Sequence, residues 1–198
     1  MTTALPVRLR VARLVTEASA PTVSLLVVMA FVGWNATPDT SSGVMWGVLA
    51  AGIAAAGPQA YILHGIRWGR ISDRHVRLRR QRRGPLVAGL ASVATSCFLL
   101  AATHAPRALL ALLIASFVGL IVSLLVTHWW KVSLHTAVAG GAIAILVLVF
   151  GARALTAIVA LPLIGWSRVA LGDHTLAQVV GGTGIGGLTA VTVFALLR

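Results

Sequence analysis

An arginine and a histidine stand close together near the carboxyl end of a chain that is otherwise strongly apolar. The segment 167–178 contains Arg168, then His174 six residues later, and Gln178 after four more. A guanidinium group makes planar, bidentate and permanently charged contacts to phosphoryl oxygens. An imidazole can act as a nucleophile or an acid near neutral pH. This combination indicates chemistry on a phosphate group.

The spacing within this segment also predicts how the histidine is oriented. If a helix begins near His174, then Gln178 lies on the same helical face, because residues four apart are neighbours. The glutamine carbonyl can then accept from the imidazole and fix its tautomer. Asp173 also fits an ordinary helix N-cap, and a histidine at a helix start is usually structural. The prediction of a site therefore rests on Arg168, His174 and Gln178 together.

A second polar segment, 129–136, lies where another apolar run begins. Trp129, Trp130 and Lys131 are typical of the belt that anchors a helix at headgroup depth. Such a belt does not account for Ser133 and His135, which open the following helix. Backbone N–H groups and the helix dipole favour an anion at such a position. Ser133 and His135 are therefore candidates for phosphate chemistry as well.

The third segment, 72–85, is strongly basic and contains Arg74, Arg77, Arg79, Arg80, Arg82 and Arg83. One interpretation is an anchor that binds anionic lipid headgroups. The other is that one or two of these arginines, Arg77 and Arg83 in particular, hold substrate phosphate.

Together the three segments resemble the motifs of the type 2 phosphatidic acid phosphatases, which are integral-membrane lipid phosphatases. The third motif of that family is Ser-Arg, five residues, His, three residues, Asp. Ser167, Arg168 and His174 match it, and Gln178 replaces the aspartate. The second motif, Pro-Ser-Gly-His, appears here as Val-Ser-Leu-His at 132–135.

The first family motif, Lys, six residues, Arg-Pro, is the most divergent of the three. Anchoring on Pro85 puts Arg77 at the lysine and Gly84 at the arginine, with Arg83 beside it. The resemblance covers about 77–178 and is most specific in the third motif.

The resemblance implies a metal-independent phosphatase that works through a phosphohistidine. In that scheme His174 attacks phosphorus, His135 protonates the leaving oxygen, Gln178 orients His174, and phosphate is bound by Arg168, Ser133, Arg77 and Arg83. The composition agrees, because the four acidic residues include no pair at helical spacing that would hold Mg²⁺ on a diphosphate. We therefore expect no metal and no cofactor. Replacing the aspartate by Gln178 predicts a slower or rewired enzyme.

The composition predicts an all-α integral membrane protein with a single domain over 1–198. Hydrophobic residues make up 58% of the chain, charged residues 10%, and mean hydropathy is +0.94. The one cysteine, Cys97, lies in an apolar run, which excludes a disulfide framework. A span needs roughly 20 apolar residues, and the pattern predicts a bundle of six or seven transmembrane helices. The apolar runs are about 20–34, 44–63, 86–103, 107–128, 136–150, 153–166 and 176–197.

The arginines predict the orientation of the chain. Eleven of them precede residue 84 and flank the first two apolar runs on one side, whereas the loop 35–43 has no basic residue. The positive-inside rule then places the amino terminus and the basic loop in the cytoplasm. With seven spans, the three polar segments share that side. The preference for arginine and alanine points to a bacterial cytoplasmic membrane.

The positive residues behind the net charge of +12 lie in loops between spans. We therefore expect membrane lipids as partners, and no nucleic acid. The expected substrate is a lipid phosphate, such as a prenyl phosphate, a prenyl diphosphate or phosphatidate. Three alternatives remain open. The same fold can carry out another phosphoryl transfer or terpenoid chemistry, the protein can bind or move anionic lipid without catalysis, or histidines such as His64 and His104 can hold haem. The last is disfavoured, because these histidines lie near span ends without evident pairing.

Gly182 and Gly186 form a GxxxG pattern, which we interpret as close helix packing or, alternatively, as a homodimer contact.

Overall fold

The computed structural model describes residues 6–198, and these residues form helices without any β-strand. This confirms the predicted all-α bundle. The helices are α1 (Val7–Ala18), α2 (Pro21–Ala36), α3 (Thr40–Arg67), α4 (Arg83–Ala102), α5 (Arg107–Trp129), α6 (Leu134–Phe150), α7 (Ala160–Ala170) and α8 (Leu176–Leu197), with short 3₁₀ helices η1 (Arg79–Gln81) and η2 (Gly151–Val159).

Polar side chains fix where several of these helices begin. Asp39 caps α3 by accepting from the backbone N–H groups of Ser41 and Ser42. Ser133 caps α6, and Thr175 caps α8 in a reciprocal capping box with Gln178. Such caps satisfy backbone donors that the first helical turn leaves unpaired. Of these three caps, Ser133 is itself a predicted site residue, and Thr175 directly follows another, His174.

Five helical segments are long and apolar enough to cross a membrane: Thr40–Arg67, Arg79–Ala102, Arg107–Trp129, Leu134–Ala170 and Leu176–Leu197. The pair α1 and α2, bent by 47°, would supply a sixth. Large side chains such as Phe98, Leu188 and Leu196 are exposed on the outside of the helices, as expected where lipid replaces water. These features fit an integral membrane protein. The structure therefore has five or six candidate spans, whereas the sequence predicted six or seven. The two ranges agree only at six.

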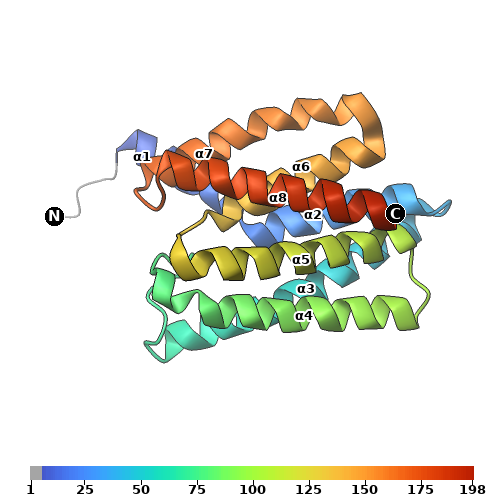
Figure 1. Cartoon of the computed structure of the whole chain (residues 1–198), viewed down its shortest axis with the longest axis horizontal. Helices are drawn as coiled ribbons and strands as arrows, with labels where there is room; N and C mark the ends of the chain where they lie inside the picture. The colour runs from blue at the N-terminus through green and yellow to red at the C-terminus, as the bar shows by residue number, and fades with distance from the viewer. Residues whose placement is uncertain (1–5) are drawn as a thin grey trace.

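The segment Leu134–Ala170 accounts for part of this difference in span number. The chain turns at Gly151, whose φ of +69° is in the left-handed region that favours glycine. The 3₁₀ helix η2 follows, and α7 then runs back along α6 (Figure 1). The predicted apolar run 153–166 is therefore divided between η2 and α7, and the two short runs form one helical hairpin.

The helices run back and forth between two ends of the bundle (Figure 1). One end carries α1 together with the loops 68–82, 130–133 and 171–175. Hydrogen bonds join these loops directly, since Arg82 bonds both the carbonyl of Val132 and His174. The three polar segments therefore meet at one end, as the sequence predicts. The other end carries the loop between α2 and α3 and the carboxyl terminus.

Small residues allow close helix contacts along the body of the bundle. A Cβ added at Gly186 would overlap the carbonyl oxygen of Ala137 on α6, and one at Gly182 would overlap that of Ser133. The GxxxG pattern therefore packs α8 on α6 within one chain, which confirms the close-packing interpretation. Since α6 already covers these two glycines, a homodimer would have to form through another surface.

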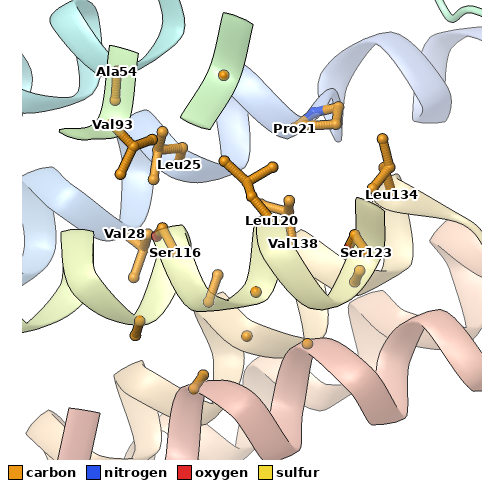
Figure 2. Close-up of a pocket in the computed structure, with 18 of the residues that line it drawn as sticks. Pro21, Leu25, Val28, Ala54, Val93, Ser116, Leu120, Ser123, Leu134 and Val138 are labelled. Carbon is orange, nitrogen blue, oxygen red and sulfur yellow. The ribbon is translucent and has the colours of Figure 1, made fainter. Parts of the chain in front are cut away.

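An apolar cavity of about 170 Å³ lies within the body, between α2, α3, α4, α5, α6 and α8. Figure 2 shows Pro21 and Leu134 at one side of it and Ala54 and Val93 at the other. Leu134 stands between Ser133 and His135 in the sequence, so one end of the cavity adjoins the polar end of the bundle. Along α6 the lining extends from Leu134 to Ile145, which is roughly 16 Å at 1.5 Å per residue.

Candidate functional site

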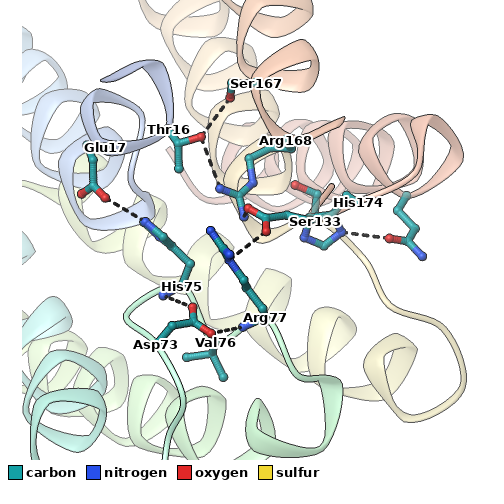
Figure 3. A network of polar contacts seen from close by, with 12 residues as sticks. Thr16, Glu17, Asp73, His75, Val76, Arg77, Ser133, Ser167, Arg168 and His174 are labelled. Carbon is teal, nitrogen blue, oxygen red and sulfur yellow. Dashed lines mark hydrogen bonds and ion pairs between the residues drawn. The ribbon is translucent and has the colours of Figure 1, made fainter. Parts of the chain in front are cut away.

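Arg168 is the buried centre of a polar cluster at this end of the bundle (Figure 3). It lies in the last turn of α7 with 1% of its surface exposed. Its Nη2 lies 2.8 Å from Oδ2 of Asp173, and the Nε of Arg77 lies 2.8 Å from Oδ1 of the same carboxylate. One buried carboxylate thus bridges two of the predicted phosphate-binding arginines.

The backbone of Arg168 also positions the residues that follow it. Its carbonyl oxygen accepts from the N–H groups of Asp173 and His174, at 3.0 and 3.2 Å. This tight reversal uses Gly172, whose φ of +69° suits the residue after a helix end. The five residues between Arg168 and His174 are therefore folded into a compact helix stop, which places the imidazole beside the guanidinium.

His174 is held in one tautomer by Gln178. The Oε1 of Gln178 lies 3.0 Å from Nδ1 of His174 and also accepts from the backbone N–H of Thr175, at 3.3 Å. The N–H of Thr175 fixes which end of the amide faces His174, so the Nδ1 of His174 must carry the proton. The lone pair of Nε2 is left for other partners, and the Nη2 of Arg82 lies 3.3 Å from it.

Burial and neighbouring cations keep this imidazole neutral. Burial, followed by the positive charges of Arg82 and Lys131, lowers the pKa of His174 from 6.5 to about 3, against the opposing effect of Gln178. Burial and then the charge of Arg82 also lower the pKa of Lys131. A neutral imidazole has a free lone pair, which a nucleophile requires. The site therefore combines a nucleophilic nitrogen with a positive local potential.

Arg82 is a site residue that the sequence interpretation missed. It is buried, with Nε donating to the carbonyl of Val76 at 2.9 Å and Nη1 to that of Val132 at 2.7 Å. Its neighbour Arg83, the predicted phosphate ligand, is exposed and lies 2.8 Å from Nδ1 of His128. The structure brings Arg77 and Arg82 into the cluster and leaves Arg83 outside it.

Ser133 and His135 both lie in the cluster, and both are buried. The backbone N–H of Ser133 donates to the carbonyl of Gln178 at 3.2 Å, which ties α6 to α8. The hydroxyl of Ser133 is used as the cap of α6, at 3.5 Å from the N–H of Thr136. His135 differs, because its Nε2 is buried and has no hydrogen-bond partner among the described residues.

Further residues that the sequence interpretation did not place in the site complete the cluster. The Nζ of Lys131, assigned from the sequence to an interfacial belt, donates to the carbonyl of Asp173 at 2.5 Å. Thr16 on α1 accepts from Nη1 of Arg168 at 3.3 Å and bonds the hydroxyl of Ser167 at 3.1 Å. The Nε of Arg168 is buried and has no hydrogen-bond partner within residues 6–198. Two nitrogens, His135 Nε2 and Arg168 Nε, are therefore available for a ligand.

The donor set of the cluster is suited to anions. Over residues 6–198, no group of three or more histidine, cysteine, aspartate or glutamate side chains is arranged to hold a metal ion. Buried donors without partners carry a large desolvation penalty, which a bound acceptor relieves. A phosphate group supplies several acceptor oxygens and a charge opposite to that of Arg82, Arg168 and Lys131.

No protein-family model, curated protein or solved structure matches this chain. The arrangement of the cluster is therefore interpreted from its own geometry and chemistry.

Proposed function

We propose that the protein is a metal-independent membrane lipid phosphatase or diphosphatase, acting on a lipid phosphate monoester or a prenyl diphosphate. The observation that carries this proposal is a neutral His174 of defined tautomer, whose Nε2 lone pair faces the buried guanidinium of Arg82. A nucleophile of defined tautomer in a preorganised positive environment is what phosphoryl transfer requires. The resemblance of 167–178 to the third phosphatase motif supports the same assignment.

In the proposed reaction, Nε2 of His174 attacks phosphorus. The bond between phosphorus and the lipid oxygen breaks, and a proton from His135 goes to that oxygen. Water then attacks the phosphohistidine and gives a proton back to His135, which releases inorganic phosphate and restores the free histidine. Arg82 and Lys131 offset the charge on the phosphoryl oxygens, and Arg168 contributes its unpartnered Nε–H.

In this scheme, phosphate competes with the carboxylate of Asp173 for the arginines. Its carboxylate already holds Arg77 and Arg168, both at 2.8 Å, so the phosphate either shares these donors or displaces the carboxylate from them. A substrate of higher negative charge competes better for the two guanidinium groups. Lipid diphosphates are therefore expected to bind more tightly than lipid monophosphates of the same chain.

The apolar cavity supports a lipid as the substrate. It begins at Leu134, next to Ser133 and His135, and its lining is mostly apolar (Figure 2). A hydrocarbon chain that enters beside Leu134 would lie between the helices while its phosphate remains at His174.

Binding of anionic lipid without catalysis is the second candidate function. Gln178 stands where the resembled motif has an aspartate, and an amide adds no charge to stabilise an imidazolium. Asp173 also neutralises two of the arginines. Terpenoid chemistry or another phosphoryl transfer on the same fold would use the same cations. Product analysis separates these three outcomes.

The direct test is phosphate release by purified protein from prenyl phosphate, prenyl diphosphate and phosphatidate in excess EDTA. We expect release from at least one of these lipids by the wild type and none by His174→Ala. Arg83→Ala is the matched control, because Arg83 is exposed and outside the cluster. Tight lipid binding by the wild type without release of phosphate or diphosphate would replace the phosphatase proposal with the binding one.

We further propose that the site opens toward the cytoplasm, because the arginine-rich loop 68–82 lies at the same end as the cluster. Single cysteines at Ser72 and Thr40, in a chain whose Cys97 is replaced, report the two ends of the bundle in intact cells. An impermeant thiol reagent should label Thr40→Cys and spare Ser72→Cys. The reverse pattern would place the site outside.

A further inference from the structure

A glutamate–histidine pair lies against the cluster and has no role in the reaction described so far. The Oε1 of Glu17, at the end of α1, lies 2.9 Å from the Nε2 of His75 in the loop 68–82 (Figure 3). The Glu17 side chain is 65% exposed, whereas that of His75 is 18% exposed. The pair therefore extends from solvent toward the interior of the site.

The inner member of this pair packs on His135. The two imidazole rings meet edge to face, with centroids 5.4 Å apart. His135 is buried, and its Nε2 has no hydrogen-bond partner in the described part of the chain. At this ring separation, a small rotation of His75 or one bridging water would connect the two imidazoles.

The charges around the two imidazoles differ. Positive charge on His135 would be opposed by burial of the ring and then by the positive charges of Arg168 and Arg82. Positive charge on His75 instead faces the carboxylate of Glu17, and the Oδ1 of Asp73 accepts from the backbone N–H of His75 at 2.9 Å. A phosphate ester that binds at His174 adds negative charge and reduces the penalty at His135.

We infer that the Glu17–His75 pair stores the proton that His135 delivers to the leaving lipid oxygen. The inference rests on the proposed function. When substrate binds, a proton passes from His75 to Nε2 of His135 and from there to the oxygen, as the phosphorus–oxygen bond breaks. In the second half of the reaction, the proton from the attacking water returns through His135 to His75. No proton is gained or lost over the cycle beyond those of hydrolysis, and His75 acts only through His135.

The test compares leaving groups of different basicity. An alkoxide leaving a prenyl phosphate needs a proton, whereas p-nitrophenolate leaving an alkyl-tailed p-nitrophenyl phosphate does not. His75→Gln should lower kcat for the prenyl phosphate by on the order of 10²-fold, a magnitude typical of lost acid catalysis, and change kcat for the nitrophenyl ester little. Glu17→Gln, on an exposed side chain, should give the same selectivity with a smaller loss.

Two controls distinguish this inference from the proposed function. His128→Gln removes a histidine that bonds Arg83 outside the cluster, and it should leave both substrates unaffected. His135→Gln should show the selective loss of His75→Gln, and the double variant should lose little more. If His75→Gln lost equal activity on both esters, or lost none, the proton-storage role would be overturned. Phosphate release by the wild type would still uphold the phosphatase. A wild type inactive on both esters would overturn both.

Discussion

The polar end and the body of this bundle are held together by different kinds of contact. At the end that carries α1 and the loops 68–82, 130–133 and 171–175, helices are joined by buried charged groups such as Arg82, Arg168 and Asp173. In the body, helices meet through glycines that bring backbones together, as at Gly140 and Gly186 on α6 and α8. The body holds the apolar cavity, and the polar end holds two buried nitrogens, His135 Nε2 and Arg168 Nε, that have no hydrogen-bond partner in the part of the chain that the structure describes.

This contrast separates stability from chemistry. Packing of small residues is what drives helix association in an apolar solvent, where burial of apolar surface adds little. The polar end instead keeps charges in a poorly solvated place, a condition typical of functional sites. Substitutions in the body should therefore change folding with little effect on the reaction, whereas substitutions at His174 or Arg82 should slow the reaction itself.

The largest effect on the reaction is expected from His174→Ala. Loss of the nucleophile should reduce phosphate release by about 10⁴-fold or more, judged from nucleophile deletions in hydrolytic enzymes. Thermal stability in detergent should change little, because the neutral imidazole makes its side-chain bonds only to Gln178 and Arg82 among the interactions described. Normal turnover in this variant would remove His174 from the mechanism.

Neighbouring arginines provide the next test, because Arg82 and Arg83 differ in burial but hardly in sequence position. Arg82→Ala should reduce kcat by about 10²–10³-fold, the range for loss of one transition-state donor. It should also lower stability, since the carbonyls of Val76 and Val132 lose their donor. Arg83→Ala should leave both nearly unchanged. Equal losses in the two variants would mean that net positive charge is what matters.

The body is tested by a pair of glycines on α8. A Cβ at Gly186 would overlap the carbonyl of Ala137, whereas no atom of the described residues lies within 4 Å of a Cβ at Gly184. Gly186→Ala should therefore destabilise the protein by about 1–3 kcal/mol, as overpacking does. Gly184→Ala should be neutral or more stable by about 0.5–1 kcal/mol. Thermal unfolding in detergent measures both, and kcat per folded molecule should stay close to that of wild type.

A smaller effect is expected from Gln178→Glu, which keeps an acceptor for His174 Nδ1 and for the N–H of Thr175. The added negative charge should raise the pKa of His174 from about 3 toward its ordinary value. In the wild type, protonation of His174 removes the nucleophile only near pH 3, so kcat/KM should fall only there. In the variant, this acid limb of the pH profile should move to higher pH. A pH profile of kcat/KM measures the shift, and an unchanged limb would mean that Gln178 does not act on His174.

The sequence predicted the local parts of the site better than the distant ones. Arg168, His174 and Gln178 lie within eleven residues, so helix geometry alone brought the imidazole to the amide. The meeting of the three polar segments followed from the alternation of spans. The choice between Arg82 and Arg83 could not be made, because adjacent residues at a helix start face different directions and either could turn inward.

Long-range contacts account for what the sequence interpretation did not find. Glu17 and His75 are 58 residues apart, and Thr16 and Arg168 are 152 apart. No periodicity in either segment indicates these contacts. Asp173 was interpreted as a helix N-cap, and its bridge between Arg77 and Arg168 depends on how the loop 68–82 folds over α7. The break at Gly151, by contrast, falls between the two predicted apolar runs 136–150 and 153–166.

The central claim is that the polar end transfers a phosphoryl group to His174, and chemical trapping tests it most directly. Protein mixed with a lipid phosphate carrying radioactive phosphorus is quenched in alkali within one turnover, and the labelled residue is mapped. The account predicts a label that is stable in base, labile in acid, located on His174, and absent from His174→Ala. Release of labelled phosphate from lipid without any label on His174, or with equal labelling of the His174→Ala variant, would contradict it.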